Sequence, residues 1–348
     1  MRIGNTLAAI LLLASTANAG AQDVATFYKN QRITMIVGYG PGGGYDIYAR
    51  TLARHIGKYI PGTPNLIVQN MPGAASLRAA NFLYNVAPKD GTVIGTFARN
   101  MPLLGLVKTN QNVQFDPQRF TWLGSSSSYA NDAYVLIARK DATVKTIADL
   151  RDRKHAPLVL ASTAEGGSGD VVPVVLRDLL ELNLKTVVGY TDSSQINLAI
   201  ERKEVDGRMV GYTAVKAAKP AWLAPDSPMH VLLAFGRADR FPEISDIPTA
   251  RELARNDRDR SLIEVFELPY TLSRPFTAPP GVPADRAKAL QQAFLAVHKD
   301  PQYLEDTGKL GLDVSPIGGE EVLRLIGKIA ATPPDLMQAV NKYIAEGG

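Results

Sequence analysis

Apolar runs of about five residues alternate with longer amphipathic stretches along most of this chain. Runs of that length, separated by stretches with helical spacing, are typical of proteins in which strands and helices alternate. The pattern therefore predicts an α/β fold. Strands are expected at residues 33–37, 65–69, 93–97, 134–138, 158–161, 186–188, 205–210 and 231–234.

Helical spacing is clearest between these runs and in the C-terminal part of the chain. Between the strands, helices are expected at residues 45–58, 74–85, 171–182 and 194–202. The C-terminal tail differs from the rest of the chain. Its pattern predicts helices at 284–298, 320–330 and 335–345 with little strand between them.

Two stretches have the character of crossings between domains, namely WLGSSSSYAN at residues 122–131 and FGRADRFP at residues 235–242. A segment bracketed by two crossings folds as its own lobe, which predicts a two-lobed clamshell. The expected division is 22–124 with 237–348 as lobe 1, and 125–236 as lobe 2. Ligand binding is expected to close the lobes by hinge rotation near residues 124–131 and 235–237.

The first 21 residues predict export. They carry one positive charge at Arg2, an apolar stretch over residues 7–14 and then small residues, which is typical of a cleaved secretory signal peptide. Cleavage is expected after Ala19 or after Ala21, since both positions fit the small-residue rule. No later segment has 18 uninterrupted apolar residues, so no later membrane span is expected.

The composition excludes several kinds of site and partner. The 348 residues include no cysteine, which excludes a disulfide framework, thiol catalysis and thiolate metal sites. The formal charge is +4, but the lysines and arginines are scattered, so no nucleic-acid partner is expected. The four histidines are dispersed without metal-ligand spacing, and neither a metal nor a cofactor is expected.

A glycine-rich loop, GYGPGGG, follows the first predicted strand and precedes a helix. Gly38, Gly40 and Gly43 satisfy the G-x-G-x-x-G pattern of dinucleotide sites. However, the second strand ends in Gln69 and Asn70 instead of an acidic residue, and Pro41 removes one backbone donor. The dinucleotide interpretation is therefore disfavoured.

A second loop of this kind, ASTAEGGSGD at residues 161–170, lies in the predicted lobe 2. Such loops free the unpaired N–H groups at a helix start, where the helix dipole adds positive charge. Two of them facing each other would form a clamp for an anion. The alternative is that the glycines only make tight turns. Gly43 and Gly44 are expected to let the backbone approach an anion, with a positive φ.

Several blocks resemble one known family. PGGGYDIYAR (41–50) resembles the P-G-G-G-T-D-x-x-A-R signature of the Bug-type (TctC-like) receptors, the periplasmic solute-binding proteins of tripartite tricarboxylate transporters. VQNMPGA (68–74), APKDGT (87–92), ISDIPTARE (244–252) and APPGVPADRAKALQQAF (278–294) resemble further blocks of that family, in the same order. The resemblance extends over almost all of the chain after the signal peptide.

The resemblance implies a type II periplasmic-binding-protein fold, with each lobe a mixed sheet flanked by helices. It implies a monomeric periplasmic receptor, not an enzyme, that binds a small organic acid and delivers it to the membrane components of such a transporter. The first loop and the loop after the fifth strand would bind a carboxylate from opposite lobes. The residues expected at the site are Tyr39, Gly42, Gly43, Gly44, Tyr45, Asp46, Gly73, Ala74, Arg99, Thr163, Gly166, Ser168, Tyr190, Ser193, Ser194 and Arg208.

The chain also departs from the family pattern, so the identity of the ligand does not carry over. Tyr45 stands where members often have Thr, Tyr39 where they have Phe, and Val210-Gly211 where an Asp-Asn is frequent. Arg99 and Arg208 are candidates for pairing with a second carboxylate. The alternative for each is a solvated surface arginine.

An exported hydrolase acting on a small carboxylate ester or amide is the alternative function. The serine run at residues 125–128 lacks a nucleophile-elbow pattern and predicts a hinge strand instead.

Overall fold

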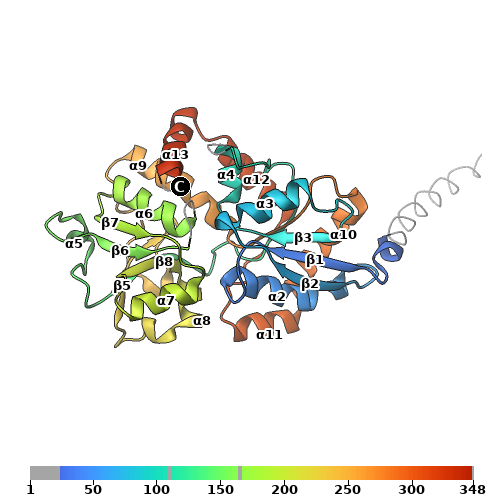
Figure 1. Ribbon diagram of the computed structural model, residues 1–348, viewed down its shortest axis with the longest axis horizontal. Coiled ribbons are helices and arrows are strands. Elements are labelled where there is room, and N and C mark those ends of the chain that lie inside the picture. Colours follow the sequence, from blue (N-terminus) through green and yellow to red (C-terminus); the bar gives the residue numbers. More distant parts are fainter. Residues whose placement is uncertain (1–23, 108–110, 164–166, 347–348) are drawn as a thin grey trace, which may run out of the picture.

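The computed structural model describes residues 24–107, 111–163 and 167–346. This part of the chain forms two lobes side by side, each built on its own mixed sheet (Figure 1). The predicted signal peptide and Gly166 lie outside the described residues. None of the described helices is long and apolar enough to cross a membrane.

Lobe 1 is built on a six-stranded sheet whose spatial order is β11-β4-β10-β3-β1-β2. The first three strands along the chain are parallel, and β10 lies antiparallel between β3 and β4. The strands are β1 (Arg32–Val37), β2 (Asn65–Asn70), β3 (Val93–Thr96), β4 (Thr121–Ser125), β10 (Pro275–Ala278) and β11 (Ile317–Gly318).

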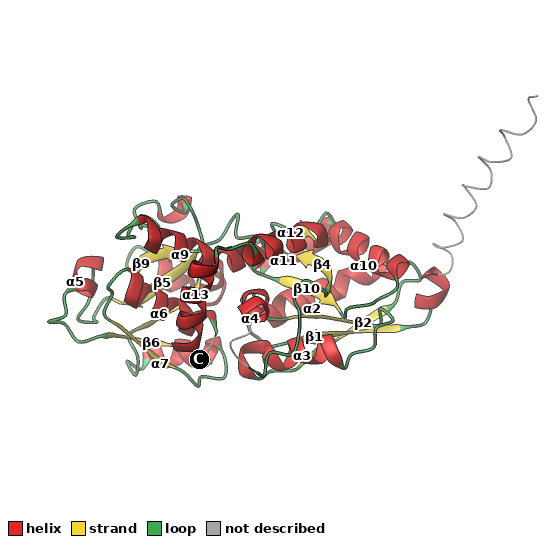
Figure 2. Ribbon diagram, turned by 90° about the horizontal axis from the view of Figure 1, so that it is seen from above, coloured by secondary structure: helices red, strands yellow, loops and turns green. Residues whose placement is uncertain are grey.

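Six helices accompany this sheet (Figure 2). α2 shows why they form: Tyr48, Leu52 and Ile56 recur every four residues, so one face is apolar and is buried in the same cluster as β1. The six are α2 (Gly44–Ile56), α3 (Leu77–Asn85), α4 (Met101–Val107), α10 (Ala284–Val297), α11 (Pro301–Lys309) and α12 (Gly319–Ala330).

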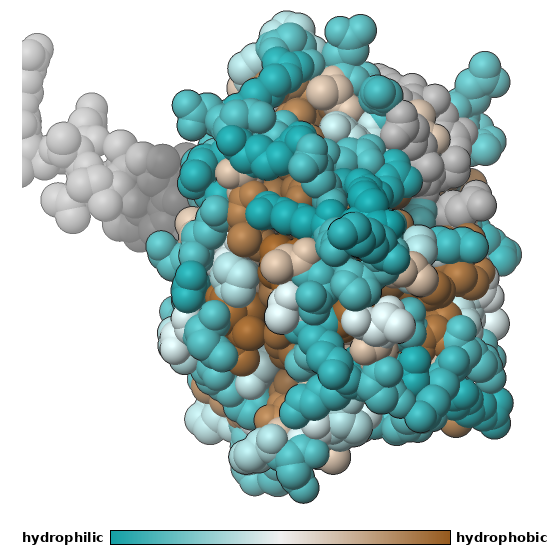
Figure 3. All heavy atoms as spheres, turned by 90° about the vertical axis from the view of Figure 1, so that its left-hand side faces the viewer, coloured by the Kyte–Doolittle hydropathy of each residue, from teal (hydrophilic) through white to brown (hydrophobic). Residues whose placement is uncertain are grey.

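Lobe 2 is built on a five-stranded sheet in the order β7-β6-β8-β5-β9. Its first helices along the chain are α5 (Ile147–Arg151), α6 (Ser168–Leu179), α7 (Ser193–Glu201) and α8 (Tyr212–Ala218). The outer end of this lobe is covered mostly by hydrophilic side chains, with smaller apolar areas between them (Figure 3). The strands are β5 (Tyr134–Arg139), β6 (Leu158–Ala161), β7 (Leu184–Val187), β8 (Gly207–Gly211) and β9 (Met229–Phe235).

Two late helices, α9 (Asp257–Glu267) and α13 (Pro334–Glu346), contact α6. Their apolar residues belong to the same buried cluster as those of β5 and α6. The sequence-based division assigns both helices to lobe 1, and this division stays a prediction. In the structure both helices help to cover the apolar face of α6.

The chain crosses between the sheets after β4 and after β9, and the two crossing segments contact each other. Arg237 Nη1 donates to the carbonyl oxygens of Tyr129 (2.9 Å) and Asp132 (2.7 Å). Ser127 donates to the buried carboxylate of Asp313, at 2.6 Å. The serine run is therefore a buried polar junction.

The described residues also contain a helical stretch at 24–28 and five 3-10 turns: η1 (Gly57–Tyr59), η2 (Ala74–Ser76), η3 (Pro220–Leu223), η4 (Pro242–Ile244) and η5 (Leu268–Leu272). The predicted fold class, a two-lobed periplasmic-binding-protein fold with mixed sheets and flanking helices, is confirmed. All eight predicted strands overlap observed ones, whereas β4, β10 and β11 were not predicted. They are short and contain Gly124, Pro275 and Gly318, which weaken the strand pattern.

Candidate ligand-binding site

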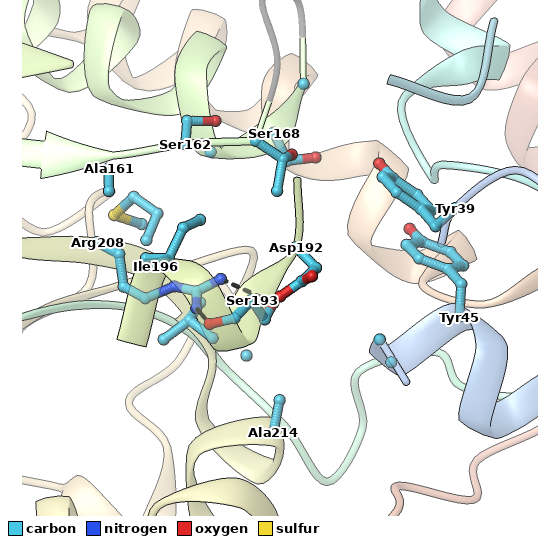
Figure 4. Close-up of a pocket in the computed structure, with 18 of the residues that line it drawn as sticks. Tyr39, Tyr45, Ala161, Ser162, Ser168, Asp192, Ser193, Ile196, Arg208 and Ala214 are labelled. Atoms are coloured by element: carbon cyan, nitrogen blue, oxygen red, sulfur yellow. Dashed lines mark hydrogen bonds between the residues drawn. The ribbon is translucent and has the colours of Figure 1, made fainter. Parts of the chain in front are cut away.

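One cavity lies between the lobes, lined by residues that follow β1, β3, β6 and β7 and by the end of β8 (Figure 4). Within each sheet the lining strands are parallel, so their carboxyl ends meet at one edge. Ligands in open α/β sheets bind outside this edge. The two predicted glycine-rich loops both contribute to the lining.

The first loop presents the start of α2 to the cavity. Gly43 is the residue before the helix, no side chain caps the first turn, and Gly44 and Tyr45 also line the cavity. The N–H groups at an uncapped helix start, together with the helix dipole, favour an anion. The loop is fixed from behind by Asp46, whose carboxylate accepts hydrogen bonds from the N–H of Gly42 (2.9 Å) and from Arg50 (2.8 Å).

The positive φ in this loop belongs to Gly42, at +82°, and not to Gly43, at −81°. The expectation of a positive φ at Gly43 is therefore wrong. Gly43 has a different property: a Cβ added there would lie 3.9 Å from the Gly40 carbonyl oxygen, so the backbone stands clear of other atoms. At this position an atom of a ligand can approach the main chain closely.

A left-handed turn supports the loop from the end of β2. Gly73, Ala74, Ala75 and Ser76 all have positive φ, between 44° and 143°. Left-handed conformations cost about 1–2 kcal/mol for each residue with a Cβ, so the turn is held by its contacts. Ser76 Oγ donates to the carbonyl oxygen of Gly38, at 3.2 Å. Gly73 and Ala74 thus act behind the lining, which they do not join.

Two arginines reach the cavity against aromatic faces. The Arg99 guanidinium lies 4.8 Å from the ring centre of Tyr129, 5.3 Å from that of Tyr134 and 4.6 Å from that of Tyr270. Arg274 lies 4.8 Å from the ring centre of Tyr45. Ring faces stabilise a cation without using its N–H donors.

A third arginine, Arg208 on β8, lines the lobe 2 side. It donates from Nη1 to Asn197 Oδ1 (2.9 Å) and to the Ser193 carbonyl oxygen (3.2 Å), and from Nη2 to Ser193 Oγ (3.1 Å). Burial lowers its pKa to about 10.

All three side chains are buried, with 6% of Arg99 and 7% each of Arg208 and Arg274 exposed. The solvated-surface alternative for Arg99 and Arg208 is therefore wrong. No described aspartate or glutamate forms a salt bridge with any of the three. Among the described lining residues, Asp192 is the only acidic one, and its carboxylate caps α7 by accepting from the N–H of Ser194 and Gln195. The cavity thus carries an excess of buried positive charge.

Two tyrosines at the lobe 1 side stack on each other, Tyr39 and Tyr45, with ring centres 4.9 Å apart. Figure 4 shows them across the cavity from Arg208 and Ser193. The Tyr45 hydroxyl accepts the backbone N–H of Arg99, at 2.9 Å. Burial alone would raise the pKa of Tyr45, but the charges of Arg99 and Arg274 outweigh it and lower the pKa.

The second glycine-rich loop brings the start of α6 to the same cavity. Gly167 precedes the helix without a side-chain cap, and Ser168 and Gly169 line the cavity. Ser162, at the end of β6, is 2% exposed and its Oγ has no hydrogen-bond partner among the described residues. A buried hydroxyl without a partner is unfavourable, so a hydrogen bond to a ligand would stabilise it.

The structure brings most of the predicted site residues together. Those that line the cavity are Tyr39, Gly43, Gly44, Tyr45, Arg99, Thr163, Ser168, Ser193 and Arg208. Gly42, Asp46, Gly73, Ala74, Tyr190 and Ser194 lie outside the lining, and the role of the whole set stays a prediction. The sequence analysis did not include Arg274, Ser162, Tyr134 and Ile196, which also line the cavity.

The contacts of the described histidines bear on the hydrolase alternative. His298 Nε2 lies 2.9 Å from Ser126 Oγ, a pairing that also occurs in serine hydrolases. However, Ser126 and His298 are 0% and 4% exposed, and neither lines the cavity. The other His nitrogen, Nδ1, lies 2.6 Å from a backbone carbonyl oxygen instead of a carboxylate. The described residues also contain no cluster of His, Asp and Glu suited to a metal ion.

No family model matches the chain. A UPF0065 protein from the gbd 5′ region of Cupriavidus necator is 27% identical over 312 residues, which cover 87% of this chain and 86% of the relative. A UPF0065 protein of Bordetella pertussis is 25% identical over 321 residues, covering 91% of this chain and 90% of the relative.

Solved structures align with this chain over a larger share of their own length than these relatives do. The periplasmic binding protein BugD has a TM-score of 0.70 at 20% identity, over 91% of this chain and 98% of BugD. The chain has the fold of the Bug-type receptors. The resemblance predicted from the sequence is thereby confirmed.

Two further neighbours of this Bug-type fold carry a bound acid. MatC from Rhodopseudomonas palustris with bound malate has a TM-score of 0.66 at 18% identity, covering 88% of this chain and 99% of MatC. A second R. palustris protein, with adipate, has a TM-score of 0.67 at 18% identity, covering 90% of this chain and 97% of its own.

Proposed function

We propose that this chain is a periplasmic solute receptor that binds a small organic acid between its lobes and delivers it to the membrane components of a tripartite tricarboxylate-type transporter. The observation that carries the proposal is the set of three buried arginines in one cavity, with no acidic partner among the described residues. Buried charges are unfavourable unless they are paired, so this cavity favours an anionic occupant.

Two further observations support a carboxylate as that anion. The uncapped starts of α2 and α6 approach the cavity from opposite lobes and add backbone donors. The neighbours with malate and adipate are both structures with a dicarboxylate. The predicted signal peptide, followed by export to the periplasm, would place the receptor where such a transporter receives its substrate.

The chain acts as a receptor and not as an enzyme, because the cavity contains groups that attract an anion and none arranged to attack it. Of the described residues that line the cavity, none is a histidine, and the buried Ser126–His298 pair lies elsewhere. Release of the acid to the transporter would follow opening of the lobes at the two crossing segments.

A thermal-shift screen of the mature protein, residues 22–348, tests the proposal. The panel contains organic acids, with neutral sugars as the matched control. An acid present at 100 times its dissociation constant adds about 2.7 kcal/mol to the free energy of unfolding, so at least one acid should raise the melting temperature clearly. Stabilisation by neutral sugars alone, or turnover of an ester or amide, would overturn the receptor proposal.

A further inference from the structure

We infer that Arg208 is a specificity-determining residue, which binds a second carboxylate of the ligand at the lobe 2 end of the cavity and so selects dicarboxylates over monocarboxylates. The inference rests on the proposed function, because it assigns one part of the same site.

The hydrogen bonds of Arg208 leave two donors on one edge of its buried guanidinium group without a partner among the described residues. An arginine has five N–H donors, and here Nη1 uses two and Nη2 uses one, all toward Ser193 and Asn197 of α7. The two donors that remain are Nε–H, which has no partner among the described residues, and the second hydrogen of Nη2. Nε and Nη2 share one edge of the planar group, and two parallel donors on one edge match the two oxygens of a carboxylate.

The surroundings of Arg208 are partly apolar. Figure 4 shows Ala161 and Ile196 near Arg208, on the side of the cavity away from the stacked tyrosines, and Asp192 beside Ser193. A cation among such side chains is poorly solvated. Its charge is therefore unfavourable without a paired anion, and it binds an anion strongly. The hydrogen bonds to α7 fix the orientation of the group, but they supply no negative charge.

The other two arginines come from lobe 1 segments, after β3 and before β10. Arg274 Nη2 lies 3.4 Å from where a Cβ of Gly44 would stand, so it flanks the start of α2. The backbone N–H of Arg99 donates to the Tyr45 hydroxyl, and its guanidinium lies 5.3 Å from the ring centre of Tyr134, at the start of β5 in lobe 2. A monocarboxylate bound beside these two arginines leaves Arg208 unpaired, whereas a dicarboxylate can pair with both ends.

Isothermal titration calorimetry of the mature protein tests the inference with acid pairs of equal carbon number. The pairs are succinate with butyrate, glutarate with pentanoate, and adipate with hexanoate. The variants are Arg208→Met, which removes the charge at similar length, and Arg208→Lys, which keeps the charge but loses the two-donor edge. Arg202→Met, at the exposed end of α7, is the matched control.

We expect the wild type to bind its best dicarboxylate about 100-fold more tightly than the paired monocarboxylate. Arg208→Met should lower the dicarboxylate affinity by about 100-fold and change the monocarboxylate affinity less than about threefold. Arg208→Lys should fall between the two, and Arg202→Met should resemble the wild type.

Equal affinity of the wild type for both members of each pair would overturn this inference and leave the proposed function standing. A folded Arg208→Met variant that keeps the dicarboxylate preference would overturn it as well. If that variant does not fold, the wild-type affinity ratio still decides. Absence of binding by every acid in the three pairs would overturn the proposed function together with the inference.

Discussion

The two ends of the cavity hold their positive charges in different ways. Arg99 and Arg274, which come from lobe 1 segments, lie against the faces of tyrosine rings, at 4.6 to 5.3 Å from the ring centres. On the lobe 2 side, Arg208 is fixed by hydrogen bonds to Ser193 and Asn197. A ring face attracts a cation without consuming its donors, while hydrogen bonds consume donors and set their direction.

This difference assigns different tasks to the two ends. The lobe 1 end combines two cations with the uncapped start of α2, so it can attract any small carboxylate. The lobe 2 end offers a single oriented guanidinium edge, so it discriminates between ligands by the presence of a second carboxylate. The affinity for an acid would thus depend mainly on lobe 1, and the choice among acids on lobe 2.

The largest effect is expected from obstructing the lobe 1 end with Gly43→Val. The φ of −81° suits valine, and an added Cβ would lie 3.9 Å from the Gly40 carbonyl oxygen, so the protein should fold. The valine methyl groups would occupy the space in front of the start of α2. We expect the carboxylate affinity to fall by more than about 100-fold. The carboxylate would lose its charge-assisted contact with the N–H groups at the start of α2, and these groups would stay buried without a partner.

Calorimetry with the best acid, and circular dichroism for folding, check the Gly43→Val prediction. Gly327→Val in α12 is the control, because a Cβ there meets nothing within 4 Å. Retained affinity in a folded Gly43→Val protein would show that the loop is only a structural turn.

The next effect is expected from Arg274→Met, which removes a cation from the lobe 1 end. We expect the affinities for a dicarboxylate and for its paired monocarboxylate to fall together, by about tenfold to 100-fold. Arg208→Met, in contrast, should affect the dicarboxylate alone. If Arg274→Met lowered the affinity for the dicarboxylate alone, the two ends of the cavity would not have different tasks.

A smaller effect is expected from Ser162→Ala, at the lobe 2 end. Because Ser162 Oγ has no partner among the described residues, its removal breaks no hydrogen bond in the ligand-free protein. The free energy of unfolding should stay equal or rise by about 1 kcal/mol, while acid affinity falls about threefold to tenfold. Urea unfolding and calorimetry measure the two quantities, with the exposed Ser245→Ala as the control. Lower stability with unchanged affinity would show a structural role instead.

The smallest effect on binding is expected from pH, because both ends use arginines and backbone N–H groups. Stability should nevertheless respond, since burial lowers the pKa of His298 to about 4 from an unfolded value of about 6.5. The stability that the neutral imidazole contributes is complete above pH 6.5 and is lost as the pH falls toward 4. Relative to His298→Gln, the wild type should lose about 2 kcal/mol between pH 7.5 and pH 5.

Urea unfolding of both proteins at the two pH values provides this difference. The comparison with the variant is necessary because burial raises the pKa of Glu267 to about 7, which acts in the opposite direction over the same range. A constant difference between wild type and His298→Gln would contradict the assignment. A large change in acid affinity over this range would place a titrating group in the cavity.

The sequence predicts the local features well. Most of the strands that end at the cavity are rich in apolar residues, and the two glycine-rich loops follow two of them, so their positions could be deduced from short stretches. The turn at Ala74–Ser76 was expected to be helical, since no sequence rule favours three left-handed residues with side chains in a row. Only its contacts with the first loop explain it.

The features that depend on distant parts of the chain could not be deduced. Arg274 precedes the short strand β10, far along the chain from the loop that it flanks, and no local pattern connects the two. Arg208 was a candidate, but its burial depends on α7 covering β8, which the residues around it do not reveal. The charge of the cavity is therefore a property of the fold and not of any single motif.

A crystal structure of the mature protein with the dicarboxylate that stabilises it most tests the central claim directly. We predict one carboxylate at the start of α2 beside Arg274, and the other on the Nε–Nη2 edge of Arg208. A ligand that places both carboxylates on the same lobe, or that binds outside this cavity, would contradict the division of tasks between the two ends.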